Sequence, residues 1–269
     1  MFISAAISPH PPIIIPEVGK ENIKEVASTV AAMKKMAAKI AEERPETIII
    51  ISPHGLIYPD RMNICVMEKL FGTFANFNAP QVKIEYENDV SLAKLIAHKS
   101  LENHIDSISY DSGEESYELD HGTMVPLYYL KSQIPDDTKI LPIGYSMLSR
   151  AKHFIFGQII RDIIANDEKN ISIIASGDLS HRLIAGAPAG FSETGKKFDR
   201  KIIDLLKNQN TKEILELDEE FVEDAGECAY HSILILLGAL DNVKHKTEIL
   251  SYEGPFGVGY LVAYFQKEY

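Results

Sequence analysis

The sequence predicts an α/β fold, a single domain over residues 1–269 in which a mostly parallel central sheet is flanked by helices on both faces. Short apolar runs alternate with longer amphipathic stretches through most of the chain. Several of these runs are apolar at nearly every position, as expected for parallel strands that are buried on both faces. No linker, low-complexity tract or repeat of whole units divides the sequence.

The expected strands are short and rich in β-branched residues. The run 47–51 reads Thr-Ile-Ile-Ile-Ile, which is β-branched at every position. The run 82–86 alternates between apolar and polar residues and predicts an edge strand. The irregular segment 59–80 predicts a hairpin excursion. In chain order, the expected strands cover residues 2–7, 47–51, 82–86, 138–145, 171–176 and 257–265.

The expected helices lie between these strands. The stretch 20–43 has apolar residues at a helical spacing, at Ile23, Val26, Val30, Met33 and Ala37. The stretch 228–240 is much more apolar than the others. In chain order, the expected helices cover residues 20–43, 89–102, 122–132, 149–165, 191–208 and 228–240.

Composition narrows the class of protein and of partner. Acidic residues outnumber basic ones by 39 to 27, and the net charge is −12, so we expect no nucleic-acid partner. The two cysteines do not form a disulfide framework, and the N-terminus lacks the basic region of a signal peptide. No apolar run approaches the roughly 18 residues of a membrane-spanning helix. We therefore expect a cytoplasmic protein that has no membrane partner.

Three expected strands end in histidine-bearing sequences. Ile-Ser-Pro-His occurs twice, ending at His10 and His54, and a third strand continues as Gly-Asp-Leu-Ser-His to His181. Proline cannot donate to a central ladder, so the chain must leave the sheet there. In open α/β sheets, ligands bind outside the carboxyl ends of the strands. We expect the three imidazoles to converge at that edge; the alternative is three separate histidines in surface loops.

A metal ion is the natural reason to gather neutral imidazoles, and two histidines need a third ligand. Glu227 opens the apolar helix, where the helix dipole favours a carboxylate, although an ordinary first-turn glutamate would look the same. Cys228 would supply a thiolate that selects a softer metal, or would be a small buried hydrophobe. His231 lies four residues after Glu227 and would share its helical face. These three alternatives stay open at this point.

One further histidine precedes a helix, in Asp120-His121-Gly122. Asp120 is suited to cap that helix, and His121 to face the same pocket and donate to a substrate oxygen. The remaining histidines have charged or amphipathic surroundings and are expected at the surface: His98, His104, His153 and His245.

These elements, in this order, resemble the class III extradiol ring-cleavage dioxygenases, in the catalytic-subunit superfamily. The matching elements are His10, His54, the Asp120-His121-Gly122 segment, the run from Gly177 to His181 and the Gly226-Glu227 helix start. The resemblance spans nearly the whole chain, as far as Gly257-Val258-Gly259-Tyr260. The chain is also similar to the Memo branch of the same superfamily.

The resemblance implies a non-haem Fe(II) ion held by His10, His54 and Glu227. It also implies His181 as the catalytic acid–base residue and His121 as a catalytic group beside the substrate. The Memo branch carries a cysteine near the corresponding helix start, which implies Cys228 as the alternative ligand and copper as an alternative metal.

The implied reaction is extradiol cleavage of a catechol-type aromatic diol by O₂. Two imidazoles and one carboxylate leave coordination positions open for diol and O₂, and a histidine near its ordinary pKa can both take and return a proton. Asp178 would orient His181 or act as a turn residue. The alternatives are a Memo-like metal-binding protein without ring cleavage, and a zinc hydrolase on the same scaffold. The expected partners are a small aromatic substrate and either a second copy of the chain or a small partner subunit.

Overall fold

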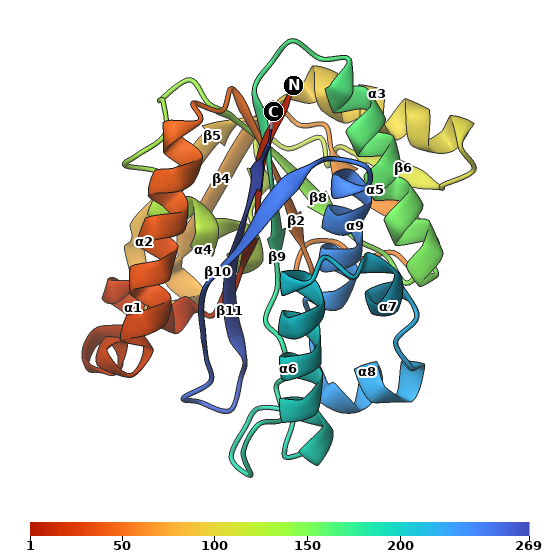
Figure 1. Cartoon of the computed structure of the whole chain (residues 1–269). Helices are drawn as coiled ribbons and strands as arrows, with labels where there is room; N and C mark the ends of the chain where they lie inside the picture. Colours follow the sequence, from red (N-terminus) through yellow and green to blue (C-terminus); the bar gives the residue numbers. More distant parts are fainter. Residues whose placement is uncertain (269) are drawn as a thin grey trace.

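The computed structural model describes residues 1–268, so Tyr269 lies outside the described part of the chain. An eight-stranded sheet runs through the middle of the molecule in the order β10-β11-β1-β9-β2-β8-β3-β6 (Figure 1). Its strands are β1 (Phe2–Ser8), β2 (Thr47–Ser52), β3 (Met62–Cys65), β6 (Ser107–Tyr110), β8 (Lys139–Gly144), β9 (Ile171–Ser176), β10 (His245–Glu253) and β11 (Tyr260–Lys267).

The four central strands, β1, β9, β2 and β8, are parallel to one another. Almost every residue in them is buried, which confirms that their apolar runs are covered on both faces. Antiparallel pairing occurs on the flanks, between β1 and β11, β10 and β11, and β3 and β8. The predicted α/β class with a mostly parallel sheet is therefore confirmed.

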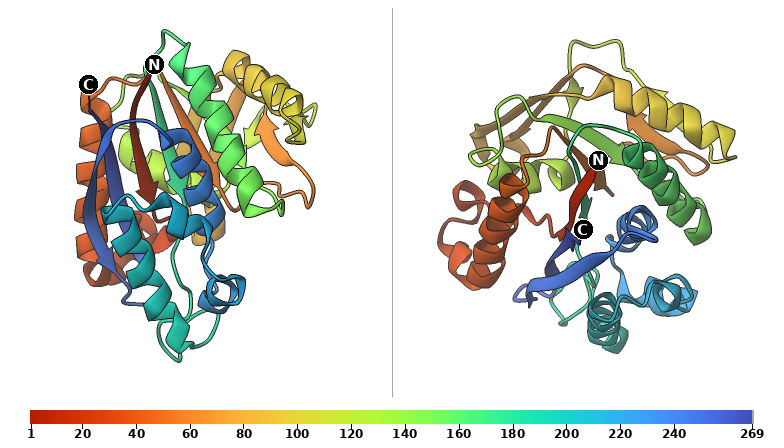
Figure 2. Two further views of the ribbon diagram at one scale, coloured as in Figure 1. Left: turned by 45° about the vertical axis from the view of Figure 1, so that its right-hand side comes forward. Right: turned by 45° about the horizontal axis from the view of Figure 1, so that its top comes forward.

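Helices cover both faces of the sheet, as Figures 1 and 2 show. On one face, α2 and α4 pack with a small three-stranded sheet, and on the other face α3, α5, α6 and α9 form the second half of the core. The small sheet has the order β5-β4-β7. The helices are α1 (Pro16–Gly19), α2 (Ala27–Glu42), α3 (Val90–Glu102), α4 (His121–Leu130), α5 (Arg150–Ala165), α6 (Glu193–Lys207), α7 (Thr211–Leu215), α8 (Glu219–Ala225) and α9 (Tyr230–Leu240).

The expected hairpin excursion over 59–80 is confirmed in its second half, because β4 (Lys69–Phe74) pairs antiparallel with β5 (Ala79–Glu87). It was wrong for the first half, because β3 belongs to the main sheet. Strand β5 lies at the edge of the small sheet, in agreement with the alternating pattern over 82–86. The third strand, β7 (Tyr117–Glu118), has only two residues and gave no strand pattern.

Two expectations for the elements were wrong in detail. The stretch 20–43 is not one helix, because Lys20–Val26 forms 3₁₀ turns before α2 begins at Ala27. Only Val26 is buried in that first part, so no apolar stripe holds it as an α-helix. Strand β10 was not expected at all, because an edge strand that is only half buried carries charges and gives no apolar run.

Within residues 1–268, the helices are too short or too polar to cross a lipid bilayer.

Candidate metal centre

The three histidine-bearing strands are direct neighbours in the sheet, in the order β1, β9, β2. They run parallel, so their carboxyl ends lie together at one edge. His10 follows β1 by two residues, His54 follows β2 by two residues, and the loop after β9 carries His181. The fold therefore delivers all three side chains to one edge of the sheet, as the sequence predicted.

The imidazoles of His10 and His54 face each other directly. Their Nε2 atoms are 2.9 Å apart. The His121 ring stacks on His54, with ring centroids 4.1 Å apart, and meets His10 edge-on at 5.4 Å. One ligand atom from each of His10, His54 and His121 lies within 4.8 Å of the other two. These three histidines form the compact nitrogen cluster of the site.

A serine at the end of β9 sets the tautomer of His10. The Ser176 hydroxyl donates to the carbonyl of Gly122 at 2.6 Å, and its oxygen lies 2.9 Å from His10 Nδ1. Since the hydroxyl proton is already used, Ser176 accepts a hydrogen bond from Nδ1–H of His10. The lone pair of neutral His10 is then on Nε2, the atom that faces His54. This is the arrangement that orients a metal-binding histidine.

Cys228 reaches the same cluster from the loop that precedes α9. Its backbone N–H and that of Ala229 both donate to the carbonyl of Asp178, at 3.1 Å. The Cys228 sulfur lies 3.5 Å from His10 Nε2 and 3.8 Å from His181 Nε2. Burial raises the pKa of the thiol, which is an S–H group unless a cation stabilises the thiolate. Cys228 thus links His181 to the histidine cluster.

Close approach of two backbones holds Cys228 there. A Cβ atom on Gly177 would lie only 2.3 Å from the Cα atom of Ala229. Glycine is therefore required after β9 for the loop before α9 to pack this closely.

Glu227 lies before α9, and its carboxylate points to the helix start. Glu227 Oε2 accepts a hydrogen bond of 2.5 Å from the backbone N–H of Tyr230. Burial raises the pKa of this carboxyl to about 7, against the opposing hydrogen bonds from Tyr230 and Ala229. Among the described residues, Glu227 contributes no atom to the nitrogen cluster, whereas its neighbour Cys228 touches His10.

Asp178 supports the backbone of His10. Its Oδ1 atom accepts a hydrogen bond of 3.0 Å from the backbone N–H of His10. Burial raises the pKa of the Asp178 carboxyl to about 7, although that hydrogen bond lowers it. The carboxylate thus ties the loop after β1 to the loop after β9.

The segment Asp120-His121-Gly122 is built as the cap of α4. Asp120 Oδ1 accepts from the backbone N–H of Thr123 at 3.1 Å and from the Ser52 hydroxyl at 2.5 Å. A Cβ atom on Gly122 would lie 2.4 Å from Ser52 Oγ, so only glycine lets α4 approach the ends of β2 and β9 this closely. The cap and the placement of His121 at the cluster are therefore both present.

The histidines of the site are neutral at pH 7. Burial lowers the pKa of His10 well below its usual value, and the neighbouring His54, His121 and His181 lower it further. Burial, with His54, lowers the pKa of His121 to about 4. The pKa values of His54 and His181 are also lowered, mainly by burial. Neutral imidazole is the form that binds a metal ion.

A second histidine pair lies behind the site and is not part of the cluster. The rings of His153 and His231 are 4.4 Å apart, and Tyr145 packs 5.2 Å from His231. The expectation of a surface position for His153 was wrong, because this residue is fully buried. In α5 it shares one face with Phe156 and Ile160, at helical spacing, and that face packs on the sheet.

The other histidines agree with expectation to different extents. His98 and His104 are exposed, as expected, whereas His245 is partly buried. The helix-borne pair of Glu227 and His231 does not form, because α9 begins only at Tyr230.

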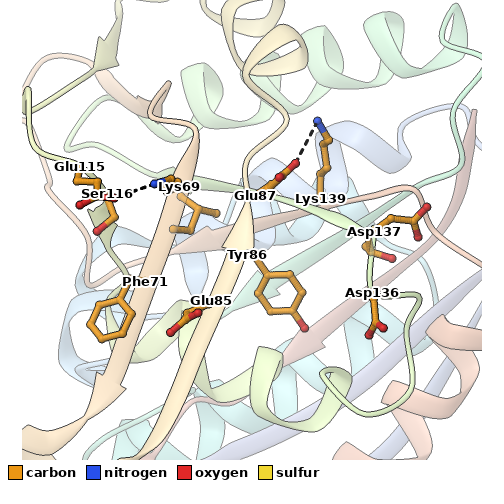
Figure 3. A pocket seen from close by; sticks show the side chains of 12 residues that line it. Lys69, Phe71, Glu85, Tyr86, Glu87, Glu115, Ser116, Asp136, Asp137 and Lys139 are labelled. Atoms are coloured by element: carbon orange, nitrogen blue, oxygen red, sulfur yellow. Dashed lines mark hydrogen bonds and ion pairs between the residues drawn. The ribbon is translucent and has the colours of Figure 1, made fainter.

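A hollow of about 570 Å³ opens beside the cluster. It lies between the small sheet and the start of α4, and His54 and His121 form part of its wall. A larger hollow, of about 700 Å³, lies between β4, β5 and the segment before β8 (Figure 3). No histidine or cysteine of the described chain lines the larger hollow. The smaller hollow is therefore the candidate substrate cavity.

Sequence reasoning missed Ser176 and the cavity walls. A signal for Ser176 did exist, because β1, β2 and β9 all end in serine, at Ser8, Ser52 and Ser176. Two of these hydroxyls hydrogen-bond groups of the site, to Asp120 and to His10. The cavity walls come from β4, β6, β7 and their loops, which have no distinctive sequence pattern.

Comparison with known families matches residues 4–263 to the catalytic LigB subunit of aromatic ring-opening dioxygenase. The chain is 38% identical to Protein CA_C1420 of Clostridium acetobutylicum over 259 residues, which is 94% of this chain and 55% of that protein. The chain therefore spans only about half the length of that relative. It is also 23% identical to the 3,4-dihydroxyphenylacetate 2,3-dioxygenase of Escherichia coli, over 93% of this chain and 94% of that protein.

A third relative belongs to the other branch that the sequence resembles. A MEMO1 family protein of Methanococcoides burtonii is 25% identical over 78% of this chain and 69% of its own length. Among solved structures, the uncharacterized protein JW3007 of Escherichia coli K12 has a TM-score of 0.65. That match has 16% sequence identity, covers 97% of this chain and 99% of the other, and supports the fold alone.

Proposed function

The chain belongs to the family of the catalytic LigB subunit of aromatic ring-opening dioxygenases, and on this premise we propose that it opens an aromatic diol with O₂ at a single iron ion. We propose His10 and His54 as two ligands of that ion and Cys228 as the third. Glu227 is the alternative third ligand.

The observation that carries this proposal is the arrangement around His10 Nε2. This atom carries the lone pair of neutral His10 and lies 2.9 Å from His54 Nε2 and 3.5 Å from the Cys228 sulfur. Two imidazole nitrogens and a sulfur that face one another are a donor set for a transition metal. The residues therefore fit a bound metal ion, and a soft donor such as sulfur suits iron or copper better than magnesium or calcium.

When bound, the metal supplies open coordination positions for the diol and O₂ and transfers electrons between them. The protein supplies the proton transfers. We propose that His181, whose Nε2 atom is 3.8 Å from the Cys228 sulfur, takes a hydroxyl proton from the diol and later returns one. His121, which stacks on His54 and lines the cavity, is placed to donate to a substrate oxygen. Asp178 holds the backbone N–H of His10, and Ser176 holds its ring.

The test is an anaerobic Fe(II) titration, by calorimetry, of the full chain, Cys228→Ser and Glu227→Gln. We expect Cys228→Ser to weaken binding about 100-fold or more, since one of three ligands is lost, and Glu227→Gln to stay within about threefold. Glu227→Gln is the matched neighbour control. The reverse result would make Glu227 the ligand.

Oxygen is then admitted to the iron-loaded chain with a panel of catechols. We expect coloured ring-opened products, which are followed by absorbance. Absence of turnover over the whole panel at full iron loading would contradict the ring-opening proposal.

A second candidate function is a Memo-like metal-binding protein that does not open rings. The contact of the Cys228 thiol with His10 and His181 favours it, because a thiolate selects a soft metal such as copper. Tight copper binding that is lost in Cys228→Ser, together with no ring opening at full iron loading, would support this candidate over the first.

A further inference from the structure

We propose that the aromatic diol opened at this site has a side chain ending in an ammonium group, and that diols ending in a carboxylate are rejected. This inference rests on the proposed function and adds the substrate class. It follows from the walls and the charges of the 570 Å³ cavity beside the histidines.

The inner part of the cavity is suited to an aromatic ring. The Phe77 ring lies 5.5 Å from the His121 ring, edge to face, and Tyr110 packs 5.8 Å from Tyr117. Met124 of α4 also lines this part. Aromatic walls and a thioether bind a flat ring well, and they attract a cation through their π faces. A ring in this cavity would have its hydroxyls toward His54 and His121.

The outer part of the cavity is acidic. Glu114 and Glu118 line it, are exposed, and have no ion-pair partner among residues 1–268. No lysine or arginine lines this cavity in the described chain. The third acid, Asp120, already accepts hydrogen bonds from Ser52 and Thr123. Two carboxylates at the mouth are therefore left without a cation.

The neighbouring Glu115 differs from these two residues. It forms an ion pair of 2.8 Å with Lys69 and faces the larger hollow instead (Figure 3). Lys69, at the start of β4, therefore pairs with Glu115 at the larger hollow and does not line the candidate substrate cavity. Glu115 is a matched control, because it has the same charge in the same loop but lines a different hollow.

At the mouth of the cavity, like charges repel and opposite charges attract. The net charge of −12 adds to the negative electrostatic potential there. A carboxylate on the substrate would meet Glu114 and Glu118 with no cation to neutralise it. An ammonium group would pair with them, while the aromatic walls add a cation–π attraction. The cavity therefore selects by the charge at the far end of the substrate.

The experiment compares three diols that share one ring and differ in the end group: dopamine, 4-methylcatechol and 3,4-dihydroxyphenylacetate. Their binding to the iron-loaded full chain is measured anaerobically by calorimetry, so that no turnover is needed. We expect dopamine to bind about tenfold tighter than 3,4-dihydroxyphenylacetate, with 4-methylcatechol between them. The ratio should fall at high salt, because the carboxylates are exposed.

The double variant Glu114→Gln with Glu118→Gln should reduce the ratio to about threefold or less, and Glu115→Gln should leave it unchanged. Equal binding of the three diols, or tighter binding of 3,4-dihydroxyphenylacetate, would overturn this inference and leave the ring-opening function standing. Failure of all three diols to bind would overturn the proposed function and this inference together.

Discussion

The two ends of the central strands β2 and β9 hold polar groups in opposite ways. At the amino end, Asp89 is almost fully buried and all its neighbours donate to it. It accepts from the Thr47 hydroxyl at 2.7 Å, from Lys169 Nζ at 2.5 Å and from the backbone N–H of Leu92 at 3.1 Å. Ser91 adds a fourth hydrogen bond of 2.7 Å. The fold itself thus satisfies the hydrogen-bonding capacity of this carboxylate, and we call this the saturated end of the strands.

At the carboxyl end, the polar groups of the site are not saturated in this way. His10 Nε2 and His54 Nε2 face each other, and the only other group at hydrogen-bonding distance from His10 Nε2 in the described chain is the thiol of Cys228. Weak donors and lone pairs that converge lower stability unless something binds between them. The comparison teaches that a saturated polar group stabilises the fold, whereas an unsaturated cluster is kept for a ligand.

The largest expected effect is on the saturated end. We expect Asp89→Ala to reduce the free energy of unfolding by about 3 kcal/mol, since it removes a helix cap and leaves Lys169 with only the more distant carboxylate of Asp167, at 3.9 Å, among residues 1–268. Urea denaturation measures this change. The matched control is Asp218→Ala, which removes an exposed cap of α8 that has no ion pair among residues 1–268 and should lose only about 1 kcal/mol. Equal losses in the two variants would show that the buried network adds nothing.

The next largest effect is on metal binding at the carboxyl end of the strands, and it concerns Ser176. We expect Ser176→Ala to weaken metal binding about 10- to 100-fold, because Nδ1–H of His10 loses its acceptor and the ring is no longer held in one orientation. Calorimetric titration measures the affinity. Ser172→Ala is the control, since it removes a buried hydroxyl of the same strand that hydrogen-bonds Ser4, away from the histidines. An equal loss of affinity in both variants would contradict the role of Ser176.

Acid should reduce the contribution of Asp89 to the free energy of unfolding by about 2 kcal/mol. Burial alone would raise the pKa of Asp89, but Lys169, Ser91, Thr47 and the backbone of Leu92 outweigh it and lower the pKa to about 2. The folded-state pKa is thus below the unfolded one, so the stabilisation is fully present above about pH 4 and is lost as pH falls toward 2. Urea denaturation at pH 5, 4 and 3 should show the advantage of the native chain over Asp89→Asn shrinking. A constant difference would contradict the assigned pKa.

Much of the fold was predictable, because β1, β2 and β9 are apolar runs bounded by clear end signals. The Ser-Pro-His and Gly-Asp-Leu-Ser-His sequences after these strands were enough to predict that His10, His54 and His181 lie at one edge of the sheet. Strand β10 was not predictable, because its half-exposed residues carry the charges of a sheet edge. To predict the buried position of His153, one would have had to notice that it shares an apolar face of α5 with Phe156 and Ile160.

The third ligand could not be predicted from the sequence, for a reason that is local and physical. Glu227 and Cys228 are adjacent, so a change of one residue in the loop exchanges the group that faces His10. That loop follows Gly226, which ends α8 with a φ angle of +62°, and is fixed by the hydrogen bonds of Cys228 and Ala229 to Asp178. These contacts join segments about 50 residues apart, and no short pattern encodes them.

The smallest expected change in stability is that of His54→Ala, and it distinguishes the carboxyl end of the strands from the amino end most clearly. His54 is exposed, and in the described chain its ring nitrogen contacts only another ring nitrogen, so we expect His54→Ala to change the unfolding free energy of the metal-free protein by less than about 0.5 kcal/mol. Iron at about 100 times its dissociation constant should stabilise the native chain by about 2.7 kcal/mol and leave His54→Ala unaffected. Urea denaturation with and without iron measures both values. If His54→Ala destabilised the metal-free chain as much as Asp89→Ala does, the histidine cluster would be part of the fold rather than a site kept for a ligand.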